Sequence, residues 1–107
     1  MKTIRLHDLL IRFFNEHLAQ QRQVSRHTIL AYRDTFRLLL RFFKATYRLT
    51  PVTLELSGLS PERVLAFLAH LEQNRTNSVR SRNARLAAIR SMCNYAEVAK
   101  RLPNPTP

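Results

Sequence analysis

Apolar residues recur at helical spacing in four segments of the chain, and polar or proline-containing breaks separate these segments. The first segment runs from Leu6 to about Gln20. Side chains three or four residues apart lie on one face of a helix, so the pattern predicts a helix with one buried side. The apolar residues expected on this side are Leu10, Ile11, Phe13, Phe14 and Leu18.

A second helix is predicted from Ser25 to about Ala45, with Ser25 as the N-cap because its hydroxyl can accept from a free amide of the next turn. The apolar face would hold Ile29, Tyr32, Phe36, Leu39 and Phe43. The opposite face would hold Arg26, Arg33, Arg37, Arg41 and Lys44. Asp34 alone interrupts this basic stripe. A face built only for solubility would mix both signs, so the stripe favours an anionic partner.

The next residues, 46–59, contain Pro51 and Gly58 and predict a packed loop. Residues 52–56, with the sequence VTLEL, could be extended, but a single strand has no partner here. We therefore expect the leucines of this loop to cover the core.

A third helix is predicted to follow Ser60, a plausible N-cap, with Pro61 at the first helical position and Glu62 near the positive end of the helix dipole. It should end near Asn74. The residues expected to be buried are Val64, Leu65, Phe67, Leu68 and Leu71.

A fourth helix is predicted from Ser78, another capping residue, to a point before Pro103. The inward residues would be Leu86, Ile89, Cys93 and Ala96. The outward residues would be Arg80, Asn83, Ala87, Arg90, Ser91 and Asn94, with Arg82 and Arg85 nearer the border. Because few long apolar side chains lie there, this face could approach a groove closely, asparagine reading adenine and arginine binding guanine or phosphate.

Together the segments predict a compact all-α domain of four, or at most five, helices. The single glycine, Gly58, agrees with this class, because a β-protein of 107 residues would need several glycines for its tight turns. A chain of this length corresponds to about one domain.

Charge narrows the choice of partner. The chain has 18 Lys and Arg against 7 Asp and Glu, a formal net charge of +11. Such a charge repels itself unless it meets a polyanion, and nucleic acid and an anionic membrane surface are the candidates. Nearly all the basic residues are arginine, which suits phosphate and guanine edges better than lysine does. Double-stranded DNA is therefore the expected partner, and no membrane partner is expected.

Other classes of site and location find no support in the sequence. No apolar run reaches the roughly 18 residues of a membrane span, and the amino terminus does not read as a signal peptide, so a cytoplasmic location is expected. Cys93 is the single cysteine, and the four histidines have no i,i+4 pairing and no cysteine neighbour. We expect no metal and no cofactor.

Three stretches in series carry a family pattern: S..T...YR.....L..F within SRHTILAYRDTFRLLLRFF, then LSPERVLAFLAHL, then SVRSRNARLAAIRSMCNYA. Together they resemble the amino-terminal core-binding domain of tyrosine recombinases, of the phage-integrase and Xer type. The resemblance covers about Leu6 to Pro105, with a departure at Met92 and Cys93, where the family usually carries aromatic residues. It implies a SAM-like helical domain that forms half of a clamp on DNA, packing against the major groove chiefly with the second and fourth helices.

The resemblance also implies a domain organisation. Residues 1–102 would be the core-binding domain and residues 103–107 the start of a linker to a catalytic domain that is absent from this chain. In the family the catalytic Arg, Lys, His, Arg and nucleophilic Tyr lie in that second domain, so this chain is expected to bind DNA and not to cut it. Tyr32, Tyr47 and Tyr95 would not be the nucleophile. The implied partners are duplex DNA, the protein's own catalytic domain and further copies of the protein on DNA.

The residues expected to contact DNA are Arg26, Thr28, Arg33, Arg37, Arg41, Lys44, Arg80, Asn83, Arg85 and Arg90. Thr28 could instead be a second capping residue, and Arg85 could lie along the border of the core.

Two other hypotheses stay open. One is a protein-docking or oligomerisation module, for recombinase assembly or for an acidic partner. Phe13, Phe14, Leu38 and Phe42 exceed one core-facing stripe, and they would form either a wider core or such a docking patch. The other is a helix-turn-helix regulator that uses the NRTN junction, residues 74–77, as its turn.

Overall fold

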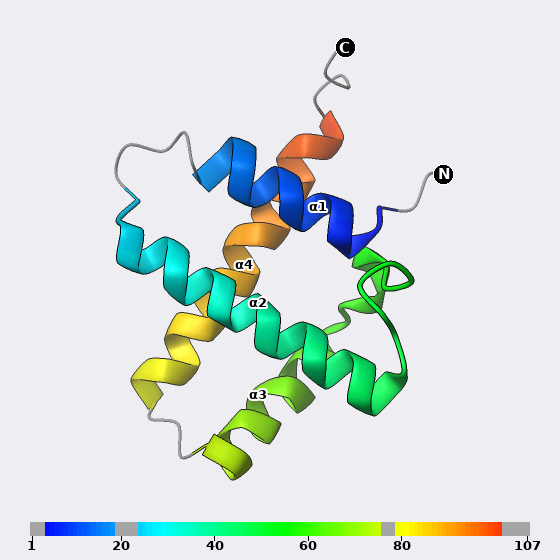
Figure 1. The fold of residues 1–107 in the computed structure, drawn as a ribbon, viewed down its shortest axis with the longest axis vertical. Helices are drawn as coiled ribbons and strands as arrows, with labels where there is room; N and C mark the ends of the chain where they lie inside the picture. The colour runs from blue at the N-terminus through cyan, green and yellow to red at the C-terminus, as the bar shows by residue number, and fades with distance from the viewer. Residues whose placement is uncertain (1–3, 19–23, 76–78, 102–107) are drawn as a thin grey trace.

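The computed structural model describes residues 4–18, 24–75 and 79–101. These residues form four α-helices: α1 (Leu6–Arg12), α2 (Arg26–Tyr47), α3 (Pro61–Arg75) and α4 (Val79–Arg101) (Figure 1). A π-helical segment, η1 (Phe13–Leu18), continues α1, and a short 3-10 turn, η2 (Leu56–Gly58), precedes α3. No strand forms among the described residues, so the prediction of an all-α domain with four helices is confirmed.

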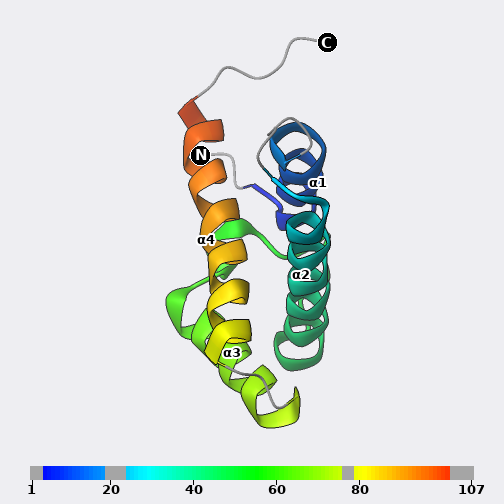
Figure 2. The same ribbon diagram turned by 90° about the vertical axis from the view of Figure 1, so that its left-hand side faces the viewer.

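The helices form two layers. Figure 2 shows α1 and α2 on one side of the domain and α4 on the other, with α3 at the lower end of α4. The apolar sides of the two layers face each other and enclose the core. Its largest fully buried side chains are Leu6, Phe13, Leu39, Phe43, Leu54, Phe67, Leu68 and Met92. All four α-helices contribute to this set, and the contribution of α4 is Met92.

The start of α2 follows the prediction closely. The Ser25 hydroxyl accepts a hydrogen bond from the Thr28 amide at 3.1 Å, and the Ser25 and Thr28 hydroxyls lie 3.0 Å apart. Ser25 is therefore the N-cap of α2, and Thr28 completes the cap. At the other end, Arg48 adopts a left-handed conformation with φ 59°, and α2 ends at Tyr47 rather than Ala45.

Replacing Ser25 with alanine should lower the free energy of unfolding by about 1 kcal/mol, because one amide of the first turn loses its acceptor. Chemical denaturation followed by circular dichroism would measure this change. Ser25→Asp keeps an acceptor oxygen at the same position and should retain most of the stability. Equal stability of the alanine and aspartate variants would contradict the capping role.

The first predicted helix changes its winding halfway. It is α-helical only to Arg12 and then π-helical from Phe13 to Leu18, while Gln20 lies outside the described residues. A π turn joins residues five apart, so it places both Phe13 and Leu18 on the buried side. The four-residue spacing misleads here: Phe13 is fully buried while Phe14 is only half-buried, and Ile11, expected in the core, is 48% exposed.

The loop before α3 does find a backbone partner. Residues Arg5 and Glu55 form an isolated antiparallel bridge, flanked by hydrogen bonds from the Leu6 amide to the Leu54 carbonyl and from the Leu56 amide to the Ile4 carbonyl, both 2.8 Å. The expectation that the segment VTLEL has nothing to pair with is therefore wrong, because the residues just before α1 supply the partner. Its leucines do cover the core, and Leu54 is fully buried.

The buried side of α3 is narrower than the sequence predicts. Phe67, Leu68 and Leu71 are buried and Val64 is half-buried, whereas Leu65 projects outward with 56% exposure. Leu65 therefore does not belong to the core, although its neighbours along the chain do. Ser60 caps α3 weakly, and its hydroxyl accepts from the Arg63 amide at 3.3 Å.

On α4 the most buried residues are Ala88, Ile89, Met92 and Ala96, whereas Leu86 and Cys93 are half-buried. The predicted capping residue Ser78 lies outside the described residues. Because the Ala88 side chain is small, α4 can pack closely against the core at this position. The sequence pattern of large apolar side chains does not include Ala88 and so did not place it in the core.

The apolar residues in excess of one stripe widen the core. Phe13, Leu38 and Phe42 are buried, and Phe14 packs half-buried with its ring centroid 6.0 Å from that of Phe36. The structure therefore supports wider burial rather than a docking patch for these four residues.

Candidate nucleic-acid interface

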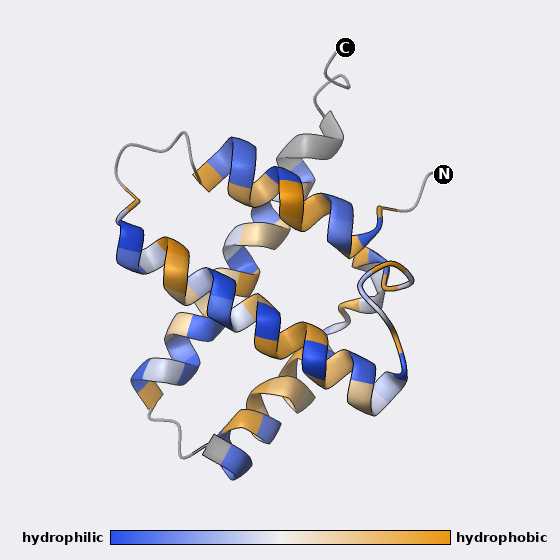
Figure 3. Cartoon of the chain, viewed as in Figure 1, coloured by the Kyte–Doolittle hydropathy of each residue, from blue (hydrophilic) through white to orange (hydrophobic). Residues whose placement is uncertain are grey.

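The predicted basic stripe of α2 lies on its solvent side. Arg26, Arg33, Arg37, Arg41 and Lys44 are all exposed, and they lie on the face opposite the buried residues of the same helix. Figure 3 shows the alternation of hydrophilic and hydrophobic residues along α2 that produces these two faces. Five cations on one exposed helical face make a surface that attracts anions.

The outward side of α4 is exposed as predicted. Arg80, Asn83, Ala87, Arg90 and Asn94 are exposed, and Ser91 is half-buried. Arg82, placed near the border by the sequence, forms an ion pair with Glu72 of α3 at 3.1 Å. Arg80, Asn83 and Arg90 thus remain the exposed candidates for nucleic-acid contacts on α4.

The two faces are not one continuous surface. Because α2 and α4 belong to different layers, the sides of these helices that are turned away from the core point in opposite directions (Figure 2). The two helices share a groove along the edge where their amino-terminal halves lie. None of the five cations of α2 lines this groove. Arg33 and Arg37 instead border a separate hollow on the outer side of α2.

The groove between α2 and α4 has a volume of about 400 Å³. It is lined by Thr28, Ala31, Tyr32, Asp34, Thr35, Ser81, Ala84, Arg85 and Ala87. Three of these residues are alanines, so the backbones of both helices come close to the surface of the groove. The sequence did not predict the groove, because it depends on the crossing of helices that are far apart in the chain.

Thr28 has two roles in this geometry. Its amide and hydroxyl belong to the cap of α2, and its half-buried side chain also lines the groove. The first turn of α2 has free amides, which favour an anion nearby. The capping role of Thr28 is observed, and a contact with phosphate stays a prediction.

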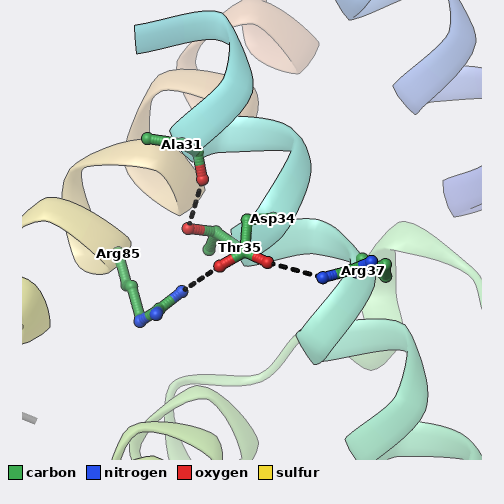
Figure 4. Close-up of polar contacts among 5 residues, drawn as sticks. All are labelled: Ala31, Asp34, Thr35, Arg37 and Arg85. Atoms are coloured by element: carbon green, nitrogen blue, oxygen red, sulfur yellow. Dashed lines mark hydrogen bonds and ion pairs between the residues drawn. The ribbon is translucent and has the colours of Figure 1, made fainter. Parts of the chain in front are cut away.

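Arg85 differs from the other candidates because it already has an anionic partner. Its Nη1 lies 3.4 Å from Oδ2 of Asp34, and its side chain is only 16% exposed. The other oxygen of Asp34, Oδ1, accepts from Nη2 of Arg37 at 2.9 Å (Figure 4). Asp34 therefore bridges a cation of α2 and a cation of α4.

The three tyrosines lie among other side chains. The Tyr32 ring stacks on Phe13 at 6.3 Å, Tyr47 carries the guanidinium of Arg63 at 4.5 Å, and the Tyr95 hydroxyl donates to Glu16 at 3.5 Å. Activating a tyrosine toward a scissile phosphate needs several cationic groups around one oxygen. These contacts give none of the three tyrosines that environment.

Cys93 is half-buried. Burial raises the pKa of its thiol, and the negative charge of Glu97 raises it further, which keeps the thiol protonated and unreactive at neutral pH. Within residues 4–18, 24–75 and 79–101, no three His, Cys, Asp or Glu side chains are grouped so that they could hold a metal ion. In the same part of the chain, no helix is long and apolar enough to cross a membrane.

The sequence of this chain matches a known protein family. The family described as "Phage integrase, N-terminal SAM-like domain" matches residues 11–100. The chain belongs to this family. Its membership confirms the resemblance to tyrosine recombinases and favours it over a helix-turn-helix regulator. The match spans all the candidate residues of α2 and α4.

Two relatives of this phage integrase domain come from Sinorhizobium fredii. "Putative integrase/recombinase y4rC" is 47% identical over 95 residues, covering 89% of this chain and 29% of the relative. "Putative integrase/recombinase y4rD" is 41% identical over 91 residues, covering 85% of this chain and 32% of the relative. The chain thus spans about a third of the length of the curated relatives it matches. No solved structure gives a significant match.

Proposed function

We propose that this domain binds double-stranded DNA and positions a site-specific recombinase on its target. The observation that carries the proposal is the stripe of five exposed cations along the outer face of α2. Family membership supports the proposal, because two relatives are named as integrase/recombinases. The proposed activity of the whole protein is the breaking and rejoining of DNA strands, with the catalytic residues outside this domain.

The duplex would lie along the edge that carries the groove. On the outer face of α2, Arg26, Arg33 and Arg37 would bind phosphates, with Arg41 and Lys44 extending the contact along the backbone. On the exposed side of α4, Arg80 and Arg90 would do the same. Phosphate contacts fix the position of a protein on DNA without reading its sequence.

Base reading would come from α4 and be limited. Asn83 is exposed and lies between Arg80 and Arg90 along the helix, and an asparagine amide can pair with adenine in the major groove. The alanines Ala84 and Ala87 line the groove and allow a close approach of the α4 backbone. Partner copies on DNA and the catalytic domain would add further contacts in the complete assembly.

A salt series tests DNA binding directly. With about six phosphate contacts, the logarithm of the association constant should fall against the logarithm of salt concentration with a slope of about −5. Fluorescence anisotropy of a labelled duplex of random sequence would measure it, with an acidic polypeptide as competitor. Binding that is steeply salt-dependent and survives the competitor is expected.

The opposite result would favour a different partner. Loss of binding to DNA in the presence of the acidic polypeptide would point to a protein-docking module. The burial of Phe13, Leu38 and Phe42 argues against these three residues as the docking surface of such a module.

A further inference from the structure

Asp34 carries a negative charge on a helix whose other charged side chains are all positive. It is the only carboxylate on α2, among five lysine and arginine residues that face solvent. A surface that binds phosphate loses affinity when it carries an anion, because like charges repel. The Asp34 side chain is 39% exposed, so burial does not explain its presence there.

The contacts of Asp34 match those of a phosphate group. Oδ1 accepts from Nη2 of Arg37 at 2.9 Å, and Oδ2 accepts from Nη1 of Arg85 at 3.4 Å (Figure 4). Each oxygen thus engages a different guanidinium, one from each helix of the proposed interface. Arginine binds carboxylate and phosphate with the same hydrogen-bond geometry, so the two groups compete for these donors.

The position of Asp34 makes this competition direct. Its side chain borders the groove between α2 and α4, and it also lines a shallow hollow on the outer side of α2 together with Leu30, Arg33 and Arg37. A DNA phosphate bound between Arg33 and Arg37 would lie next to the carboxylate. It would have to repel Asp34 or replace it on Arg37.

The ion pair with Asp34 also keeps Arg85 from binding a phosphate. The Arg85 side chain is mostly buried, and its Nε atom has no hydrogen-bond partner among the described residues. Arg85 lines the groove, and Asp34 engages the Nη1 end of its guanidinium there. While the pair persists, this end of Arg85 cannot serve a phosphate.

We propose that Asp34 is an internal competitor for DNA phosphate, which holds Arg37 and Arg85 and thereby weakens binding to duplex of any sequence. The inference rests on the proposed function of the domain and concerns how tightly that function operates. Non-specific affinity that is too high would hold a recombinase on the wrong DNA, so a built-in anion raises the relative weight of sequence-reading contacts.

Asp34→Asn tests this proposal, because it keeps the shape of the side chain and removes its charge. Binding to a random duplex should become about tenfold tighter, as one or two charge-assisted contacts with phosphate become available. The salt slope should become steeper by about 0.9 for each phosphate gained. Asp8→Asn is the matched control: it makes the same charge change on α1, where Asp8 contacts only the adjacent His7 in the described contacts. It should tighten binding by less than about twofold.

Arg85→Gln, made in both backgrounds, separates competition from a purely structural role. In the wild-type chain it should change affinity little, because Asp34 already holds Arg85. In the Asp34→Asn background it should reverse part of the gain. Thermal melting checks that each variant is folded. If Asp34→Asn alone unfolds, the double variant, which leaves no mostly buried guanidinium without a partner, is compared with Arg85→Gln. It should still bind more tightly through the exposed Arg37.

The outcomes distinguish this inference from the proposed function. Folded Asp34→Asn that binds no more tightly than the wild-type chain, while the wild-type chain shows salt-dependent binding, would overturn the inference and leave the proposed function standing. Binding by Asp34→Asn but not by the wild-type chain would support the inference in its strongest form. No binding by either variant at low salt would overturn both.

Discussion

Replacing Phe13 with alanine is expected to lower the free energy of unfolding by about 3–5 kcal/mol. Phe13 is fully buried, and its ring contacts those of Phe14, Tyr32, Phe36 and Tyr95 at centroid distances of 5.4–6.3 Å. Removing the ring leaves a cavity where η1, α2 and α4 meet. Domains of this size are stable by only about 5–15 kcal/mol, so the variant should be partly unfolded at 37 °C.

Urea denaturation followed by circular dichroism would measure the loss. Leu65→Ala provides the control, because Leu65 is apolar but 56% exposed and should cost no more than about 0.5 kcal/mol. A loss for Phe13→Ala as small as that for Leu65→Ala would show that η1 does not pack as described. The same pair of variants tests the sequence-based expectation that Leu65 belongs to the core.

Replacing Arg26 and Arg33 together with glutamine is expected to weaken binding to every duplex by about two orders of magnitude, at about 1.5 kcal/mol for each charged contact. Both side chains are exposed on the outer face of α2, and no ion pair occupies either of them in the described part of the chain. The salt slope should become shallower by about 1.8. Anisotropy titrations at several salt concentrations give both quantities.

Arg5→Gln with Arg48→Gln is the matched control for this pair. It removes the same two charges, but Arg5 precedes α1 and Arg48 follows α2, at the opposite end of α2 from Ser25. If the net charge alone drove binding, the two double variants would lose affinity equally. A much smaller loss for Arg5 and Arg48 is expected, because a contact with a particular phosphate depends on position. Arg26 lies at the start of α2, where a cation opposes the helix dipole, so its removal should not destabilise the fold.

The sequence predicted α2 well because its signals agree with one another. Ser25 can cap, the apolar residues follow a helical period, and the five cations occupy the remaining face. Each of these signals depends only on residues close together in the chain. In a long helix, a few residues that depart from the pattern do not change the prediction. The exposure of these cations was predictable for the same reason.

The errors arose where a non-local contact decides the structure. The π turn of η1 depends on how Phe13 packs between α2 and α4. The backbone bridge of Glu55 depends on Arg5, which lies just before α1 and 50 residues earlier in the chain. Asp34 and Arg85 are 51 residues apart, so no spacing rule connects them. A border position for Arg85 was predictable from its helical angle, but its partner was not.

The groove was also out of reach of the sequence. The positions of Ala31, Ala84 and Ala87 along their helices do not indicate a groove. Only the crossing of α2 over α4 brings these three residues together around it. Only the structure shows that the outer faces of the two helices point in opposite directions (Figure 2).

The backbone pairing of Ile4 and Leu6 with Leu56 and Leu54 has a consequence for the thermodynamics of association. It fastens the start of the α1–α2 layer to the loop that leads into α3, while the Asp34–Arg85 pair joins the layers near the groove. These contacts fix the arrangement of α2 and α4 in the free domain. Complex formation would then cost little backbone entropy, and the ordering penalty would fall on the tips of the long arginine side chains.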